Sequence, residues 1–292
     1  MTKILSSPSQ SSFTLNCQGR LICLETPKLM GILNVTPDSF SDAGKFQTQK
    51  AALAQAELMV SEGADILDLG PQSTRPGASF LSAKEEIERL GSLIPILKKE
   101  FPEVLISVDS FWSETLRFAF DQGMDIVNDI SAGQYDPSLF ETVADLQIPY
   151  ILMHVNPTYE SMHEKHPDPE ITTTVNRFLV NKARVLTQMG VKDIILDPGF
   201  GFGKTQEDQE KLIGEVDFLG FGNYPLLIGI SRKSFIYKPL NKTPLDSKVD
   251  ELTQELHLKV LRQGAKILRV HEVANAKKTL SLFLSEQKGK KA

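Results

Sequence analysis

The sequence contains eight short apolar runs, and most of the segments between them have the periodicity of helices. The runs are rich in Ile, Leu and Val and do not alternate with polar residues, which is typical of parallel strands buried on both faces. They are Leu29–Leu33, Ile66–Leu69, Val104–Val108, Ile126–Val127, Tyr150–Met153, Ile194–Leu196, Leu226–Ile230 and Ile267–Val270. Eight strands alternating with helices predict an α/β fold, a (β/α)₈ TIM barrel, with a doubly wound open sheet as the alternative.

The predicted helices end in a repeated manner. They cover Gln49–Glu62, Ala83–Glu100, Trp112–Gln122, Glu170–Met189 and Ser247–Gln263. Four of these five helices are followed by a glycine and then almost at once by an apolar run, which is typical of a helix-to-strand loop with a glycine cap. Pro95 lies inside the second helix, where we expect a kink. No glycine-rich dinucleotide turn follows the first run, which favours the barrel over the open sheet.

Two segments lie outside this pattern. Residues 13–24 predict a β-hairpin that turns at Gln18–Gly19–Arg20 and plugs the bottom of the barrel. The short basic stretch 288–292 predicts a disordered tail. No linker or shift in composition divides the chain, so we expect a single domain over residues 1–292.

Charge and cysteine content narrow the class of protein. A formal net charge of −5 argues against a nucleic-acid-binding protein, although a few Arg and Lys side chains can still attract an anionic small substrate. Cys17 and Cys23 are too few for a disulfide framework, so we expect reduced thiols. No apolar stretch approaches the roughly 18 residues of a membrane span, and residues 1–12 lack the apolar region of a signal peptide. We therefore expect a cytoplasmic protein.

Polar side chains stand where the apolar runs stop. They include Asn34, Asp68, Asp109, Asn128, His154, Asp197, Ser231, Lys233, Arg269 and His271. In a barrel, the carboxyl ends of parallel strands meet at one rim, so these side chains are expected to converge there as an active site.

One group of these side chains is suited to a diphosphate and its metal ion. Arg269 and His271 are two apart on one strand and therefore point to the same side. Asn34 ends the first strand of the barrel, next to the last, and its amide oxygen is a hard ligand suited to Mg²⁺. Taken alone, His271 would more readily be interpreted as a hydrogen-bonded structural histidine, but Arg269 beside it and Asn34 on the adjoining strand favour a ligand.

A second group is suited to a flat heterocycle. Carboxylates and an amide can match a ring edge that carries N–H and NH₂ groups, and a carboxylate can accept two parallel N–H bonds. The group consists of Asp109, Asn128, Asp197 and Lys233. Each Asp alone could instead be a helix cap or a surface charge. The glycines around Phe200 and Phe202 let a flat ligand approach the backbone.

His163 and His166 are interpreted as residues of a solvated loop rather than as a metal-binding pair.

Together these segments resemble the dihydropteroate synthase family. The resemblance covers residues from about 28 to 273 and rests on MGILNVTPDSFSD, STRPGA, SVDS, NDIS, LMH, DPGFGFGK, SRKSF and RVHEV, in that order. It implies a (β/α)₈ barrel that joins 6-hydroxymethyl-7,8-dihydropterin diphosphate to 4-aminobenzoate with Mg²⁺, releasing diphosphate by a dissociative step. It also implies a homodimer.

The resemblance implies a role for individual residues. Those expected to bind the pterin are Asp109, Asn128, Met153, Asp197, Phe202 and Lys233. Those expected to hold the diphosphate are Asn34, through Mg²⁺, and Thr74, Arg269 and His271. Those expected to shape the aminobenzoate site are Phe40, Arg75, Pro76, Ser231 and Ser234. Those expected to act in catalysis are Asp42, Asp109, Lys233, Arg269 and His271.

The chain departs from the family pattern at several positions, among them Ala43, Pro71, Gln72 and Tyr237. None of these removes an expected ligand. The departures leave open a non-catalytic pterin-binding barrel. A related barrel, the methyltetrahydrofolate–corrinoid methyltransferase, is a further alternative, but it would have no use for Asn34, Arg269 and His271 together.

Overall fold

The computed structural model describes residues 12–35, 45–72, 80–156, 158 and 161–291. Eight parallel strands form one sheet in the order β8-β7-β6-β5-β4-β3-β10-β9. Their bounds are Lys28–Asn34 for β3, Ile66–Gly70 for β4, Leu105–Asp109 for β5, Ile126–Asp129 for β6, Tyr150–Met153 for β7, Ile194–Asp197 for β8, Leu227–Ile228 for β9 and Ile267–Val270 for β10. Leu196 and Leu226 form a parallel bridge that links the two end strands, so the sheet closes into the predicted barrel.

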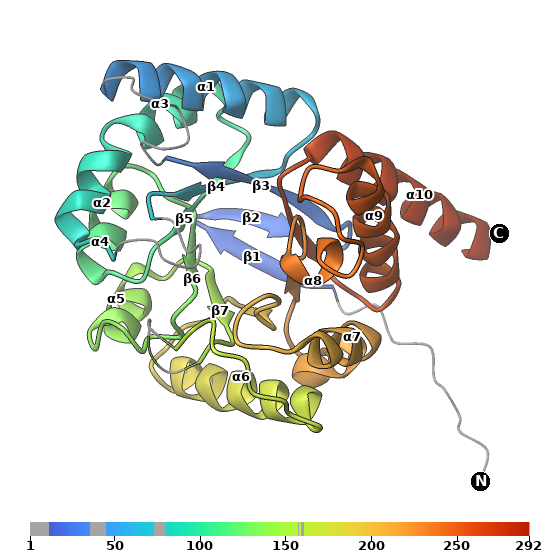
Figure 1. Cartoon of the computed structure of the whole chain (residues 1–292). Helices are drawn as coiled ribbons and strands as arrows, with labels where there is room; N and C mark the ends of the chain where they lie inside the picture. The colour runs from blue at the N-terminus through green and yellow to red at the C-terminus, as the bar shows by residue number, and fades with distance from the viewer. Residues whose placement is uncertain (1–11, 36–44, 73–79, 157, 159–160, 292) are drawn as a thin grey trace, which may run out of the picture.

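Helices surround the strands (Figure 1). They are α1 Lys45–Ser61, α2 Ala83–Leu90, α3 Leu93–Glu100, α4 Ser113–Asp121, α5 Leu139–Leu146, α6 Ile171–Gln188, α7 Gln206–Gly214, α8 Ser234–Tyr237, α9 Ser247–Arg262 and α10 Val273–Lys291, with the 3₁₀ segment Val216–Gly222 after α7. The glycines predicted to end α1, α4, α6 and α9 all have φ between 95° and 102°, the left-handed conformation of a glycine cap. The predicted helix ends are therefore confirmed.

One prediction about the helices is wrong. The chain between residues 83 and 100 breaks at Gly91, where φ is +50°, and not at Pro95. Pro95 is the third residue of α3, a first-turn position where its missing N–H has no helical partner to lose. Helix α10 runs through Lys291 and Ala292 lies outside the described residues, so the disorder expected of the 288–292 tail stays a prediction. Two bonds between Arg262 and Glu286, at 3.0 and 2.6 Å, tie this part of α10 to α9.

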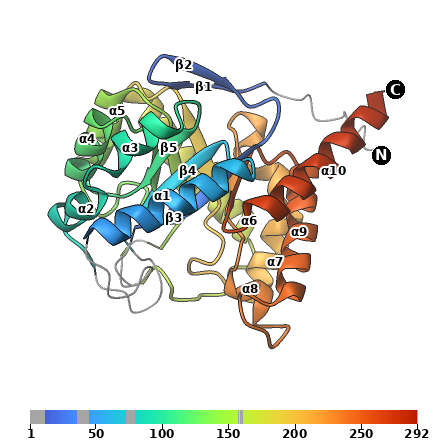
Figure 2. The same ribbon diagram turned by 90° about the horizontal axis from the view of Figure 1, so that it is seen from above.

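The predicted hairpin forms and covers one end of the barrel. Strands β1 (Thr14–Cys17) and β2 (Arg20–Cys23) pair antiparallel, and Gln18 and Gly19 both have positive φ, as a two-residue hairpin turn requires. Leu15, Cys17 and Leu24 pack against the first inward-pointing residue of each barrel strand; those residues are Met30, Ile66, Leu105, Ile126, Ile151, Ile195, Leu227 and Ile267. Figure 2 shows the hairpin at that end. The bottom of the barrel is therefore closed by apolar packing.

The barrel interior changes from apolar to polar toward the other end. Side chains two residues further along a strand point to the same side, so the next inward layer follows directly from the register. In five strands this layer is polar: Asp68, Ser107, Asn128, Asp197 and Arg269. In the described part of the chain, no helix is both long enough and apolar enough to cross a membrane.

Candidate active site

Asp68 is the centre of the polar layer. Its side chain is fully buried, and its two oxygens accept hydrogen bonds from Ser107 Oγ at 2.6 Å, Asn128 Nδ2 at 3.0 Å and Arg269 Nε at 2.7 Å. These bonds join β4, β5, β6 and β10 inside the barrel. Asp68 was noted in the sequence among the polar residues where the apolar runs stop, but it was given no binding or catalytic role. The sequence signal that could have indicated this role was a carboxylate within an apolar run, since a buried carboxylate must be paired.

Arg269 also reaches Asp109, at the carboxyl end of β5. Its Nη2 donates to Asp109 Oδ2 at 2.7 Å. Burial raises the pKa of Asp109 to about 7, although Arg269 opposes that rise. Burial lowers the pKa of Arg269, but the carboxylates of Asp68 and Asp109 outweigh burial and raise it above its ordinary value. The guanidinium is therefore a permanent positive charge between two carboxylates.

Asp197, at the end of β8, begins the glycine-rich turn. Its Oδ1 accepts the N–H of Gly199 at 2.7 Å. Burial raises the pKa of Asp197, while the Gly199 N–H and the charge of Lys233 oppose the rise. Gly199 has φ +68°, and a Cβ there would lie 2.0 Å from the carbonyl oxygen of His154, so only glycine fits. Met153, also predicted to lie near the ring, is buried and pairs with Asp197 in the sheet register.

Lys233 lies over the same turn. Its Nζ is 4.4 Å from the centroid of the Phe202 ring, within the range of a cation–π contact. A Cβ on Gly201 would lie 2.8 Å from the Lys233 side chain, so the bare backbone there makes room for it. Burial lowers the pKa of Lys233 to about 8, and the charge of Arg269 adds to the effect. The structure thus brings together Asp197, Phe202 and Lys233, as predicted for a pterin site.

The two loop histidines behave differently from each other. His166 is exposed, as predicted for a solvated loop. His163 stacks on Phe202, with ring centroids 5.6 Å apart and planes 15° apart, so the prediction of a solvated loop is wrong for His163. No sequence signal indicated this contact, because the two rings come from separate loops.

The described residues contain no group of three or more His, Cys, Asp or Glu that could hold a metal ion.

Two of the predicted diphosphate residues, Asn34 and Arg269, lie on neighbouring strands, and His271 follows directly after the second strand. His271 Nδ1 is 3.1 Å from Ser231 Oγ, and the His271 backbone N–H donates to the same oxygen. Strand β10 pairs with β3, which ends at Asn34. Gly70 lies opposite Asn34, and a Cβ on it would come within 3.2 Å of Asn34 Oδ1. The strand order therefore places Asn34 at the end of β3 and His271 just beyond the end of the neighbouring β10, so His271 is not on the strand of Arg269 as expected.

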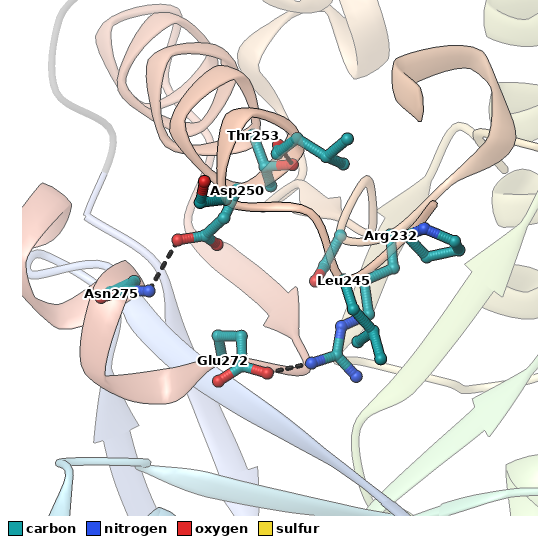
Figure 3. Close-up of a pocket in the computed structure, with 10 residues that line it drawn as sticks. Arg232, Leu245, Asp250, Thr253, Glu272 and Asn275 are labelled. Carbon is teal, nitrogen blue, oxygen red and sulfur yellow. Dashed lines mark hydrogen bonds and ion pairs between the residues drawn. The ribbon is translucent and has the colours of Figure 1, made fainter. Parts of the chain in front are cut away.

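Arg232 lies between Ser231 and Lys233 but has a different environment. Its φ of +58° is unusual for a residue with a side chain. The side chain pairs with Glu272 in a pocket of about 270 Å³ that Asp250, Thr253 and Asn275 also line (Figure 3). This ion pair connects the loop that carries Lys233 to the loop that carries His271.

Several predicted residues lie outside the described ranges: Phe40, Asp42, Ala43, Thr74, Arg75 and Pro76. Ser234 is the half-buried first residue of α8. The departures at Pro71 and Gln72 have structural roles, since the Pro71 carbonyl accepts from Arg89 and the Gln72 side chain accepts the N–H of Leu81. Tyr237, the last residue of α8, packs against the core.

The expected Mg²⁺ requires oxygen ligands at this rim of the barrel. In the described part of the chain, the hard oxygen predicted as a ligand is Asn34 Oδ1, which lies beside Gly70, a residue without a side chain. Mg²⁺ commonly takes one or two protein ligands and completes its shell with water and substrate phosphate oxygens. The residues present therefore fit a Mg²⁺ that is held jointly with a diphosphate, and they do not fit a cage made by protein side chains alone.

A family model described as "Pterin binding enzyme" matches residues 30–271. This chain belongs to that family. It is 40% identical over 257 residues to the dihydropteroate synthase of Streptococcus pyogenes serotype M18, covering 87% of this chain and 94% of that protein. Among solved structures, the Xanthomonas albilineans dihydropteroate synthase with 4-aminobenzoic acid superposes with a TM-score of 0.87 at 35% identity, covering 95% of this chain and 99% of that one. The same enzyme in complex with 7,8-dihydropteroate gives 0.82 at 33% identity, with 94% and 99% covered.

Proposed function

We propose that this chain catalyses dihydropteroate synthesis: the condensation of 6-hydroxymethyl-7,8-dihydropterin diphosphate with 4-aminobenzoate to give 7,8-dihydropteroate and diphosphate. The observation that carries the proposal is the position of Arg269. It is bonded to Asp68 and Asp109 and lies two residues before His271 on the strand next to Asn34. The groups proposed to bind the pterin ring and those proposed to bind the diphosphate therefore lie at one rim of the barrel. A substrate that joins a pterin to a diphosphate requires this arrangement.

The pterin is bound by the carboxylate and amide groups. Asp197 faces the 2-amino and N3–H edge of the ring, where one carboxylate can accept two parallel bonds. Its raised pKa reflects burial, and paired N–H donors favour the ionised form. Phe202 and Met153 provide apolar contact, and Lys233 is placed over the Phe202 ring. Asp109 and Asn128 provide further polar contacts to the pterin ring.

The diphosphate is the leaving group. Arg269 and His271 are positioned to stabilise the negative charge that grows as the bond between the pterin methylene carbon and oxygen breaks. Mg²⁺, held by Asn34 and the diphosphate, would add positive charge to the leaving oxygens when bound. The methylene cation that remains is delocalised over the pterin ring, and the carboxylate of Asp109 would stabilise its positive charge.

4-Aminobenzoate needs no strong base, because its aryl amine is already a nucleophile. The amine nitrogen forms the new bond to the methylene carbon and then loses a proton to solvent. Ser231 and Ser234 lie in the loop and helix that follow β9, next to Lys233. We place the aminobenzoate at this side of the pterin. Phe40, Arg75 and Pro76, which lie outside the described residues, are proposed as further contacts on the family resemblance alone.

Release of diphosphate tests the proposal. The purified protein is mixed with the pterin diphosphate, 4-aminobenzoate and Mg²⁺, and diphosphate and dihydropteroate are measured together. We expect equal amounts of both products, and no dihydropteroate without aminobenzoate or after chelation of Mg²⁺. Binding of the pterin without product formation would instead indicate a non-catalytic barrel. Diphosphate release without a need for aminobenzoate would indicate a hydrolase.

Assembly is a separate part of the proposal. Relatives of this family are expected to form homodimers, so we propose a homodimer here. Sedimentation or light scattering at micromolar concentration tests it, and a mass of one chain at all concentrations would contradict it.

A further inference from the structure

Lys204 is a buried lysine just beyond the glycine-rich turn, here defined as residues 199–203. It is 1% exposed, although lysines are rarely buried in proteins. Its Nζ lies 2.8 Å from the Gly199 carbonyl, 3.2 Å from the Phe202 carbonyl and 3.1 Å from His154 Nδ1. An ammonium group has three N–H donors, so these three acceptors can satisfy it completely.

The chemistry of the three acceptors supports this pairing. Burial, together with the charge of Lys204, lowers the pKa of His154 well below its ordinary value, so the ring is neutral and Nδ1 can accept. Burial also lowers the pKa of Lys204 to about 7, while Asp197 opposes that effect. A buried amine is costly unless each donor is paired, and here the partners are mostly carbonyls of the turn. The amine is therefore bonded to the turn and not to a surface charge.

The turn determines the positions of two predicted pterin contacts. The Gly199 N–H orients the Asp197 carboxylate, and Phe202 carries the ring beneath Lys233. The three glycines of the turn have φ of +68°, +84° and +57°. Glycine has the largest conformational freedom of any residue, so a turn with three of them is not rigid by itself. Its geometry must be held from outside.

Gln209, on α7, holds the turn from its other side. It is 1% exposed, its Oε1 accepts the N–H of Gly201 at 3.0 Å, and its Nε2 is 3.5 Å from the Lys204 carbonyl. The helix that carries it is anchored at its start by the Thr205–Asp208 capping box. Lys204 thus bonds to Gly199 and Phe202, while Gln209 bonds to the glycine between them.

We propose that Lys204 and Gln209 are positioning residues for pterin binding, which fix the 199–203 turn so that Asp197 and Phe202 meet the ring in one geometry. The inference rests on the proposed function, because it assumes that the turn faces the pterin. Both side chains are 1% exposed, so we do not expect either to contact the substrate. Their loss should weaken pterin binding and leave the diphosphate group, which Arg269 and His271 hold, unaffected.

The test uses Lys204→Met, which keeps an unbranched side chain of similar length and removes the donors. Binding of 6-hydroxymethylpterin and of inorganic diphosphate is measured separately by calorimetry, well below the melting temperature of each variant. We expect the pterin Kd to rise by about tenfold to a hundredfold, the range for losing one to two well-placed hydrogen bonds. The diphosphate Kd should stay within about twofold of that of the original protein.

Lys98→Met is the matched control. Lys98 is a partly buried lysine that bonds to Asp125, at the hairpin end of the barrel. Its loss leaves the buried Asp125 carboxylate without this partner, far from the 199–203 turn. Stability should therefore fall while the Kd values for 6-hydroxymethylpterin and diphosphate stay unchanged. An equal rise of the pterin Kd in both variants would show a general loss of structure and overturn the proposal, as would an unchanged pterin Kd in Lys204→Met.

Gln209→Leu covers the case in which Lys204→Met does not fold. It removes the bond to Gly201 and leaves the charge of Lys204 in place. We expect a several-fold rise in the pterin Kd with unchanged diphosphate binding, and an unchanged pterin Kd would contradict the proposal. Failure of the original protein to bind 6-hydroxymethylpterin would instead overturn the proposed function, so the two failures are distinguishable.

Discussion

The Nε–H of Arg269 donates a hydrogen bond to the buried carboxylate of Asp68 at 2.7 Å. The two residues are 201 positions apart in the sequence and meet inside the barrel. This bond orients the guanidinium so that its other end reaches Asp109. Arg269 was predicted as a diphosphate ligand, and the structure adds that its position depends on a carboxylate below it.

The first prediction concerns Asp68→Asn. The substitution keeps the shape of the side chain but removes the charge that pairs with Arg269. We expect the free energy of unfolding to fall by about 1–3 kcal/mol, the range for a hydrogen bond to a charged group. We also expect weaker binding of inorganic diphosphate, because Arg269 is less well oriented. Urea unfolding and calorimetry measure the two effects, and a variant unchanged in both would contradict this role of Asp68.

The second prediction concerns the pH dependence of pterin use. Burial lowers the pKa of Lys233 to about 8, so its ammonium loses its proton as the pH rises through that value. The kcat/KM for the pterin diphosphate should therefore fall above about pH 8. In Lys233→Arg the alkaline fall should disappear, since a guanidinium stays charged throughout. A fall at the same pH in this variant would assign the titration to another group.

The third prediction concerns acid stability. His257 is buried on α9, and burial lowers its pKa to about 4. Between pH 6.5 and 4 the unfolded chain binds a proton at this residue and the folded chain does not, so stability falls as the pH is lowered through this window. The loss can reach about 3 kcal/mol for a shift of this size.

The variant His257→Leu should remove that part of the pH dependence. The readout is the slope of the unfolding free energy between pH 6.5 and 4, which is independent of the baseline change that the substitution causes. His166→Gln is the control, because His166 is exposed. The same slope in His257→Leu as in the original protein would rule out His257 as the source.

The fourth prediction concerns the ion pair between Arg232 and Glu272 (Figure 3). Their side chains are 30% and 49% exposed, so the pair contributes less than about 1 kcal/mol to stability. Glu272→Gln should leave the melting temperature nearly unchanged. It should raise the KM for the pterin diphosphate a few-fold at low salt, because the loops with Lys233 and His271 are no longer tied together.

The control for this experiment is Glu286→Gln, which breaks a comparable ion pair between α9 and α10. Its KM should not change. At high salt the difference between Glu272→Gln and the original protein should shrink, since salt screens exposed charges. A KM difference that persists at high salt would mean that the pair does not act through charge.

The position of several polar side chains could be predicted from the sequence. Polar residues at or near the ends of the apolar runs, such as Asn34, Asp109, Asp197 and Arg269, lie toward the carboxyl ends of the strands, because parallel strands of a barrel share one rim. Their roles toward a substrate stay predictions. The resemblance to a known family then supplied roles that no single run could indicate. The kink at Pro95 was wrong, because a proline in the first turn of a helix is tolerated and a glycine nearby ended the preceding helix.

The sequence by itself determined the barrel, its hairpin plug and the rim where polar groups gather, since strands, helices and glycine caps follow from local patterns. Only the tertiary structure decided which of these groups pair: Asp68 with Arg269, Lys204 with the turn, His163 with Phe202. The physical reason is that a buried charge or donor is paired by whatever the closed barrel brings near it. Those partners come from distant strands and separate loops, so no local pattern records them.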